Sequence, residues 1–188
     1  MRLVLALVIM LMLTSAASAI AEKASTGPFS VSFDLNTSMN YSVKEEPVIA
    51  VPAYSINKLL ILTNNSSGAE IGITEYSNLT DSSLLISRNY EALRMASVSA
   101  YYRNISSIDL MIDRKEGFAV SGVNSLGQRL IYAFYWLDSK SCECGPVSVG
   151  TISVGVTSTY PLNVTKNLIN TLHIERNGAK RPSLGKLF

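Results

Sequence analysis

Residues 129–137 read RLIYAFYWL, a run that is apolar on both faces of an extended chain. Side chains alternate across a strand, so one face carries Ile131, Ala133, Tyr135 and Leu137 and the other carries Leu130, Tyr132, Phe134 and Trp136. A strand that is apolar on both faces belongs inside a sheet that is covered on both sides. The segment therefore predicts an interior strand and a buried Trp136.

Further strand patterns lie on both sides of this segment. Residues 29–35 alternate between apolar and polar, and the runs 56–63 and 71–74 flank turn-forming residues at 64–68, which predicts a hairpin. Alternating or β-branched runs predict other strands at 41–44, 108–112, 118–123 and 147–160. The short turns between these segments indicate a mostly antiparallel sheet.

Two proline residues and two helices complete the expected element order. Segment 41–44 is expected to pair with 29–35, before Pro47 and Pro52 interrupt regular structure. One helix is expected from 84 to about 102, capped by Thr80 or Asp81, and a second over 163–173, capped by Asn163. The second helix places a buried stripe on Val164, Leu168, Ile169 and Leu172. The expected fold class is α+β, a mostly antiparallel sheet covered by two helices.

This order resembles the PsbP-like family, which is named for an extrinsic subunit of photosystem II. The residues that carry the resemblance are the opening strand Gly27–Leu35, the sheet–helix–sheet order, and Thr159-Tyr160-Pro161 before the last helix. The resemblance covers residues 27–175 and implies an extracytoplasmic α-β-α sandwich. It also implies a role in binding or assembling larger complexes. No site motif matches, so it implies no functional residue.

The first 21 residues have the layout of a secretory signal peptide. Met1-Arg2 is cationic, residues 3–13 are apolar without interruption, and Ala17-Ser18-Ala19 and Ala19-Ile20-Ala21 offer small-x-small cleavage sites. The apolar run is shorter than the ~20 residues of a membrane span. We expect export, a mature chain that begins near Ile20 or Glu22, no membrane span in it, and a secreted or cell-surface location.

The remaining chain divides into three parts by composition. We expect a polar lead-in at 22–28, a single domain at 29–175, and a basic flexible tail at 176–188. The whole chain has 16 Lys and Arg residues against 14 Asp and Glu, and the loss of Arg2 with the leader leaves a net charge of +1. This balance gives no electrostatic support for a nucleic-acid partner.

Sequons are the second compositional signal. Seven of the 13 asparagines stand in Asn-x-Ser/Thr triplets, where chance predicts about two or three. The candidate N-glycosylation sites are Asn36, Asn40, Asn64, Asn65, Asn78, Asn104 and Asn163. Either the protein is a glycoprotein, as in eukaryotic secretion or, as we favour, an archaeal envelope, or a Ser- and Asn-rich surface produces the triplets by accident.

The sequence contains no complete catalytic or metal-binding set. Cys142 and Cys144 can form a small strained disulfide, remain free thiols, bridge to another chain or serve a redox or metal role. His173 is the only histidine and is expected to complement the end of the last helix. We therefore expect no metal, no cofactor and no catalytic residue.

Two other groups can be interpreted either as sites or as ordinary structure. Asp109 and Asp113 would lie about 13 Å apart on one strand, too far for a glycosidase pair, which favours a solvated face. Exposed Tyr132, Phe134 and Trp136 would form a sugar-stacking platform, but their apolar neighbours favour a core role. The pair Tyr101 and Tyr102 is the better candidate for an exposed aromatic patch.

Three function classes follow from these observations. The first is a non-enzymatic binding or assembly accessory of the cell envelope, with an envelope or extracellular protein partner. The second is a structural surface or matrix glycoprotein that self-associates. The third is a secreted hydrolase. A concave pocket would favour an enzyme, and a broad exposed apolar patch would favour assembly.

Overall fold

The computed structural model describes residues 21–63, 67–77, 102–138 and 150–177. About two thirds of these residues lie in strands, and the described part contains one helix. The strands form two antiparallel sheets, one of seven strands and one of three. No described helix is long and apolar enough to cross a membrane.

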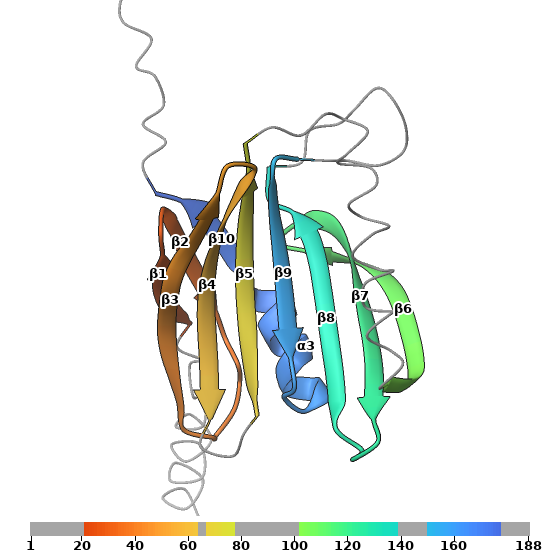
Figure 1. Cartoon of the computed structure of the whole chain (residues 1–188). Coiled ribbons are helices and arrows are strands. Elements are labelled where there is room, and N and C mark those ends of the chain that lie inside the picture. Colours follow the sequence, from red (N-terminus) through yellow and green to blue (C-terminus); the bar gives the residue numbers. More distant parts are fainter. Residues whose placement is uncertain (1–20, 64–66, 78–101, 139–149, 178–188) are drawn as a thin grey trace, which may run out of the picture.

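The large sheet has the order β3-β4-β5-β9-β8-β7-β6. Its strands are β3 (Tyr41–Val51), β4 (Tyr54–Thr63), β5 (Gly68–Tyr76), β6 (Tyr102–Ile112), β7 (Lys115–Asn124), β8 (Arg129–Trp136) and β9 (Ile152–Ser158). The small sheet has the order β1-β2-β10, made of β1 (Glu22–Thr26), β2 (Phe29–Phe33) and β10 (His173–Arg176). The helix α3 (Leu162–Thr171) joins β9 to β10 (Figure 1).

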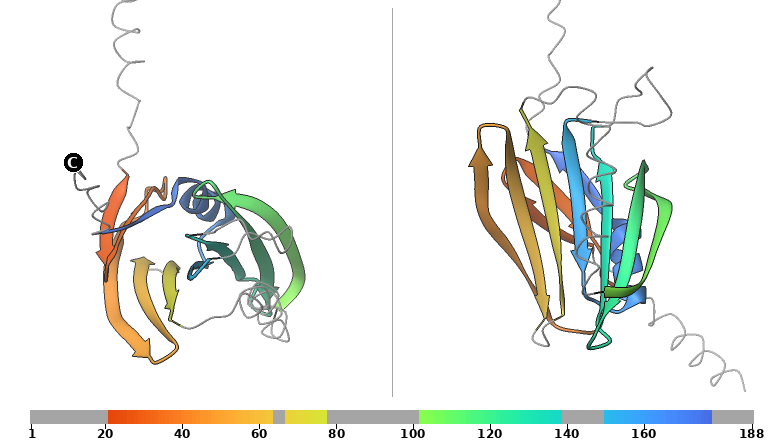
Figure 2. Two further views of the ribbon diagram at one scale, coloured as in Figure 1. Left: turned by 90° about the horizontal axis from the view of Figure 1, so that it is seen from above. Right: turned by 45° about the vertical axis from the view of Figure 1, so that its right-hand side comes forward.

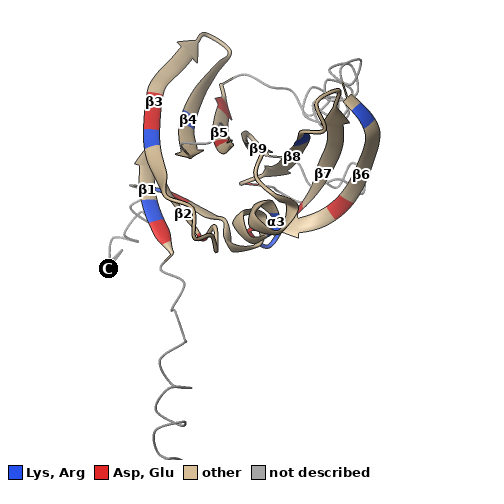
Figure 3. Ribbon diagram, turned by 90° about the horizontal axis from the view of Figure 1, so that it is seen from below, with Lys and Arg blue, Asp and Glu red and all other residues tan. Residues whose placement is uncertain are grey.

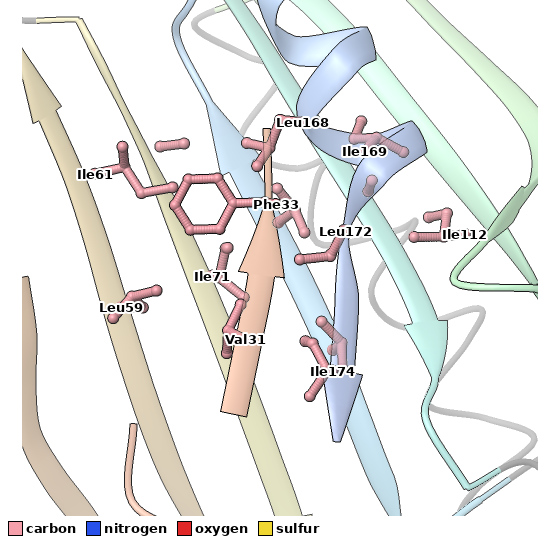
Figure 4. Packing of buried hydrophobic residues seen from close by; sticks show 14 of the residues in the cluster. Val31, Phe33, Leu59, Ile61, Ile71, Ile112, Leu168, Ile169, Leu172 and Ile174 are labelled. Atoms are coloured by element: carbon pink, nitrogen blue, oxygen red, sulfur yellow. The ribbon is translucent and has the colours of Figure 1, made fainter. Parts of the chain in front are cut away.

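The large sheet is strongly curved. Seen from above, it bends around the small sheet and α3, which both lie on its concave side (Figure 2). Side chains from both layers meet there in one core (Figure 4). Buried members of this core include Val31 and Phe33 of β2, Leu59 and Ile61 of β4, Ile71 of β5, Leu168 and Leu172 of α3, and Ile174 of β10. Their burial provides most of the driving force for closing the concave side.

The expected α-β-α sandwich with two covering helices is wrong. The concave face is covered by a second sheet together with one short helix, and the chain is mostly β. Two segments account for the difference. Residues 22–28, expected to be a polar lead-in, contain β1, and residues 173–176, expected to end the last helix and begin the tail, form β10. Each pairs with one edge of β2.

The two helices have different outcomes. The last helix is confirmed, and Val164, Leu168, Ile169 and Leu172 are all buried as its stripe predicts. It ends at Thr171, and Leu172 has an extended backbone that starts the path into β10. The earlier expected helix lies outside the described residues, except that Tyr102, expected at its end, begins β6.

The predicted alternation of the strands is confirmed, whereas one of the two predicted strand pairings is wrong. β8 lies between β9 and β7, and Tyr135 and Trp136 are buried on its opposite faces. The expected hairpin is β4–β5. Segment 41–44, however, belongs to a long strand β3 that pairs with β4 and continues through Pro47. Proline is tolerated because β3 is an edge strand and Pro47 falls in its bulge.

Candidate functional site

The last helix is anchored to the sheet at its first turn. Pro161 is the N-cap residue, and no side chain caps the helix, so the capping role expected for Asn163 is wrong. The anchor is Thr165, whose buried hydroxyl lies 2.7 Å from the Ser158 hydroxyl and also donates to the Tyr160 carbonyl. This network joins the end of β9 to α3 and orients the helix.

The helix presents one apolar face and one face that is half polar. Val164, Leu168 and Leu172 point into the core, whereas a second stripe at Leu162, Lys166, Ile169 and Asn170 faces strands β6 to β8. These positions follow the spacing of three and four residues that places side chains on one side of a helix. The second stripe forms one wall of an open groove.

The opposite wall comes from three adjacent strands. The sheet register places Ile108 of β6 opposite Ala119 of β7, and Ser121 of β7 opposite Ile131 of β8. Together with Leu110, these residues leave a space of about 120 Å³ beneath the helix. An apolar cavity of about 150 Å³ holds one benzene molecule. The groove therefore has room for one apolar side chain or a similar group.

The rim of the groove is polar and weakly basic. The hydroxyls of Ser106 and Ser121 lie 2.9 Å apart on the sheet side, and Lys166 and Asn170 stand on the helix side. Among the described residues that line the groove, Lys166 is the single charged one. Elsewhere, basic and acidic residues are spread over the strands (Figure 3). The groove thus combines an apolar floor with one cation.

The groove opens along strand β6, at the edge of the large sheet. Among the described residues, only β7 pairs with β6. Ile108, which lines the groove, is 61% exposed, whereas Met111 and Ile105 are 59% and 43% exposed and lie outside the groove lining. A bulge near Asn104, whose φ is +55°, separates the first two residues of the strand, Tyr102 and Arg103, from its regular part at 106–112.

A histidine and two carboxylates tie the end of β6 to the strand that follows α3. The Nδ1 of His173 lies 2.7 Å from Oδ1 of Asp113, and Nε2 lies 3.0 Å from Oε1 of Glu175. The backbone N–H of Ile174 donates to the second oxygen of Asp113. Carboxylates only accept, so imidazolium is the form that donates to both. These hydrogen bonds, that with Asp113 first, raise the pKa of His173 above its usual value.

The solvated-face interpretation of the aspartates is wrong for Asp113. Its side chain is 9% exposed and is held by β10. The strand ends at Ile112, and Asp113 has a positive φ in the turn, so the alternation that put it on the same side as Asp109 no longer applies. Asp109 stays on β6, opposite Phe118.

The aromatic residues of β8 belong to the interior. Phe134 is 3% and Trp136 2% exposed, which confirms the core interpretation over a sugar-stacking platform for these two rings. They lie on the outer, convex face in a row of ring contacts that runs through Tyr54, Tyr76, Trp136, Phe134, Phe118 and Tyr132. On the inner face, burial raises the pKa of Tyr135 well above its usual value.

Most other candidate sites are either exposed or outside the described residues. The sequon asparagines Asn36, Asn40, Asn104 and Asn163 are all exposed. Cys142, Cys144, Tyr101, Asn64, Asn65 and Asn78 lie outside the described residues. The described part contains no group of three His, Cys, Asp or Glu side chains arranged to hold a metal ion.

Sequence reasoning missed the groove. A second helical stripe at 162, 166, 169 and 170 was readable, but half of it is polar. Its opposite wall depends on the register of three strands, which the sequence does not show. No family model, curated protein or solved structure matches the chain. The PsbP-like resemblance is therefore untested by these comparisons, although the α-β-α sandwich that it implied is not the fold.

Proposed function

We propose that the protein is a non-enzymatic binding domain that works outside the cytoplasm and receives an apolar group of a partner in the groove between α3 and strands β6 to β8. The observation that carries the proposal is the groove itself. It is apolar at its floor, polar at its rim and open to solvent along β6. Such a surface matches the centre and rim of a binding interface.

Two other observations support the proposed location outside the cytoplasm and the proposed non-enzymatic role. The leader layout and the exposed sequons fit an exported glycoprotein. His173 lies with each ring nitrogen on a carboxylate, away from the groove lining, so it has no free nitrogen to act as a base there. A hydrolase is therefore the least favoured of the three function classes.

The proposal is tested by photo-cross-linking in the native envelope. A benzophenone amino acid replaces Leu162, which lines the groove and is 41% exposed, and in a second protein it replaces Val48 of β3, which is 50% exposed. We expect a discrete adduct from position 162 that position 48 does not give. The same adducts from both positions, or none from 162, would contradict a binding role for the groove.

Lateral self-association is a second candidate with its own observation. The edge strand β3 and the start of β4 expose Val48, Ile49, Val51 and Tyr54, each by 36% or more. A matrix protein would use such a patch between copies. In that case the adduct from position 48 would be a dimer of the protein, and the groove position would give none.

A further inference from the structure

We infer that the natural occupant of the groove is an extended peptide segment of a partner protein, which adds as a strand to the edge of β6 that no described strand covers and inserts one apolar side chain beneath α3. This inference rests on the proposed function and makes it more specific. It is carried by the backbone of β6, by the face that an added strand would present to the groove, and by Lys166.

The backbone of β6 can form hydrogen bonds with one more strand. An edge strand presents a row of unpaired N–H and C=O groups, which an extended chain can satisfy. The other edge of the same sheet, β3, carries Lys44, Glu45 and Glu46 followed by Pro47 in a bulge, all of which discourage pairing. Over 106–112, β6 contains no proline or bulge and a single charged residue, Asp109.

Every second side chain of an added strand would face the groove. Neighbouring strands lie ~4.8 Å apart, and directly opposite residues share a face. Ser106, Ile108 and Leu110 all face the groove, so every second residue of a strand paired with them would do the same. An apolar side chain at that position would cover Ile108 and occupy the space above Ala119.

The charge at the rim favours an acidic residue in the partner segment. Lys166 is exposed beside the groove, and no described acidic side chain lines it. An exposed ion pair adds little to affinity. We therefore expect the charge to select among segments rather than to drive binding.

The test begins with selection of a displayed library of random peptides, about ten residues long, on the folded protein without its leader. The best binder is synthesised in two N-methylated forms, each methylated at one alternate set of amides. Only one set faces β6 in a paired strand. We expect that set to weaken binding by about tenfold or more, as the loss of hydrogen bonds should, and the other set to change it little.

Matched variants of the protein locate the binding site. Ala119→Leu fills the groove, whereas Ala50→Leu adds the same atoms to the exposed edge strand β3. We expect Ala119→Leu to weaken the selected peptide at least about tenfold and Ala50→Leu to have no effect. Ser121→Leu fills the same groove from a half-buried position and replaces Ala119→Leu if thermal unfolding shows that variant to be misfolded. Lys166→Glu should weaken acidic binders by up to about fivefold.

Several outcomes would overturn the inference and leave the proposed function intact. One is equal loss from both N-methylated sets, which means apolar capture without strand pairing. Another is a lipid rather than a protein in the adduct from position 162, together with binding of dodecanoate that Ala119→Leu abolishes. A third is a solution dimer that Ala119→Leu dissociates, which would make a second copy the occupant. A library without groove-dependent binders would overturn the inference as well.

Discussion

Asp113 links the β6–β7 turn to β10 through one carboxylate. It follows β6, its first oxygen binds His173, and its second accepts the backbone N–H of Ile174 in β10. With Arg114 it forms a two-residue turn in which both residues have positive φ, the geometry that suits the twist of a hairpin. A single residue thus joins the β6–β7 turn to the strand that closes the small sheet.

The contact between His173 and Asp113 predicts that the stability of the fold depends on pH at pH values above the ordinary pKa of histidine. The pKa of His173 is raised in the folded protein, because Asp113 and then Glu175 accept its protons. A raised pKa contributes stability that is complete below the unfolded value of ~6.5 and is lost as the pH rises through the folded value. We expect the free energy of unfolding, measured in urea, to fall as the pH rises from about 6.5 through that folded pKa.

The control for this prediction is His173→Gln, which keeps a polar side chain and cannot titrate. The variant should lose the decline in stability over that pH interval. The charged groups that contact His173 are Asp113 and Glu175, and the Asp113 carboxylate also acts on the buried Tyr135. An unchanged slope in the variant would assign the pH dependence to another group.

Trp136 tests the aromatic row at the residue scale. Its ring is 2% exposed and contacts Tyr76 and Phe134. Trp136→Ala should therefore cost about 3–5 kcal/mol of unfolding free energy, as large core truncations do. Its Nε1 is buried without a hydrogen-bond partner among the described residues. Trp136→Phe removes that donor and keeps a ring, so it should cost less than the alanine variant.

Two measurements check this prediction. Equilibrium urea unfolding gives the free energies, and the fluorescence of Trp136, the only tryptophan of the chain, should be blue-shifted in the folded state. Leu126→Ala serves as the control because Leu126 is 89% exposed, and it should change stability by less than about 0.5 kcal/mol. A Trp136→Ala variant with nearly unchanged stability, together with fluorescence of the unchanged protein typical of tryptophan in water, would contradict the burial of Trp136.

At the element scale, α3 is the piece that gives the concave side both a core and a groove. One stripe of the helix packs on β2 and the core, and the adjacent stripe faces β6 to β8. Its first turn has no side-chain cap and no acidic residue, so its own end gives it little stability. The helix depends instead on packing and on the Ser158–Thr165 contact.

Thr165→Val tests that dependence. The two side chains have the same shape, so the change removes the hydrogen bonds to Ser158 and to the Tyr160 carbonyl and keeps the volume. We expect a loss of about 1–3 kcal/mol, because buried polar partners lose a hydrogen bond. Urea unfolding measures it, and the control is Thr157→Val in β9, a half-buried threonine whose hydroxyl has no hydrogen bond among the described residues. Equal effects of both variants would contradict a special role for the first turn.

The turn between β6 and β7 shows where element boundaries escape the sequence. The charged run Arg114-Lys115-Glu116-Gly117 has the composition of a turn, but the turn is Asp113-Arg114 and Gly117 lies inside β7. A Cβ at Gly117 would come within 2.5 Å of the Phe134 carbonyl oxygen. The glycine therefore serves a close approach between strands β7 and β8. From the sequence alone, a glycine required by a turn cannot be told from a glycine required by a close approach between two strands.

At the scale of the whole molecule, the curvature of one sheet creates both the core and the groove. Seven strands bend around the small sheet and α3, and the bend brings β6 toward the helix (Figure 2). Ala119 and Ser121, two residues with small side chains, are part of the groove lining on the sheet side. Binding at this edge would extend the sheet rather than deform it.

Export is the prediction that concerns the chain as a whole. The layout of residues 1–21 predicts removal of the leader, so N-terminal sequencing of native protein should begin between Ile20 and Lys23. Such a start keeps β1, which begins at Glu22, or removes only its first residue. Cytosolic protein that retains Met1 would contradict the prediction, and a chain cut beyond Thr26 would lose β1.

The sequence by itself determined β2, most strands of the large sheet and the sides that these strands bury. Alternation predicts the buried residues of β2 and the two covered faces of β8, and the period of the helix predicts the inward stripe of α3. These are local properties, because a side chain's face follows from its position in a strand or helix.

Only the tertiary structure decided what covers the sheet. β1 and β10 are short and half polar, and they become strands because each pairs with an edge of β2. The pairing of β5 with β9, the bend of the sheet and the groove at β6 likewise join residues that are far apart in the chain. Hydrogen bonds between distant strands depend on the whole packed arrangement, and no local pattern of side chains records them.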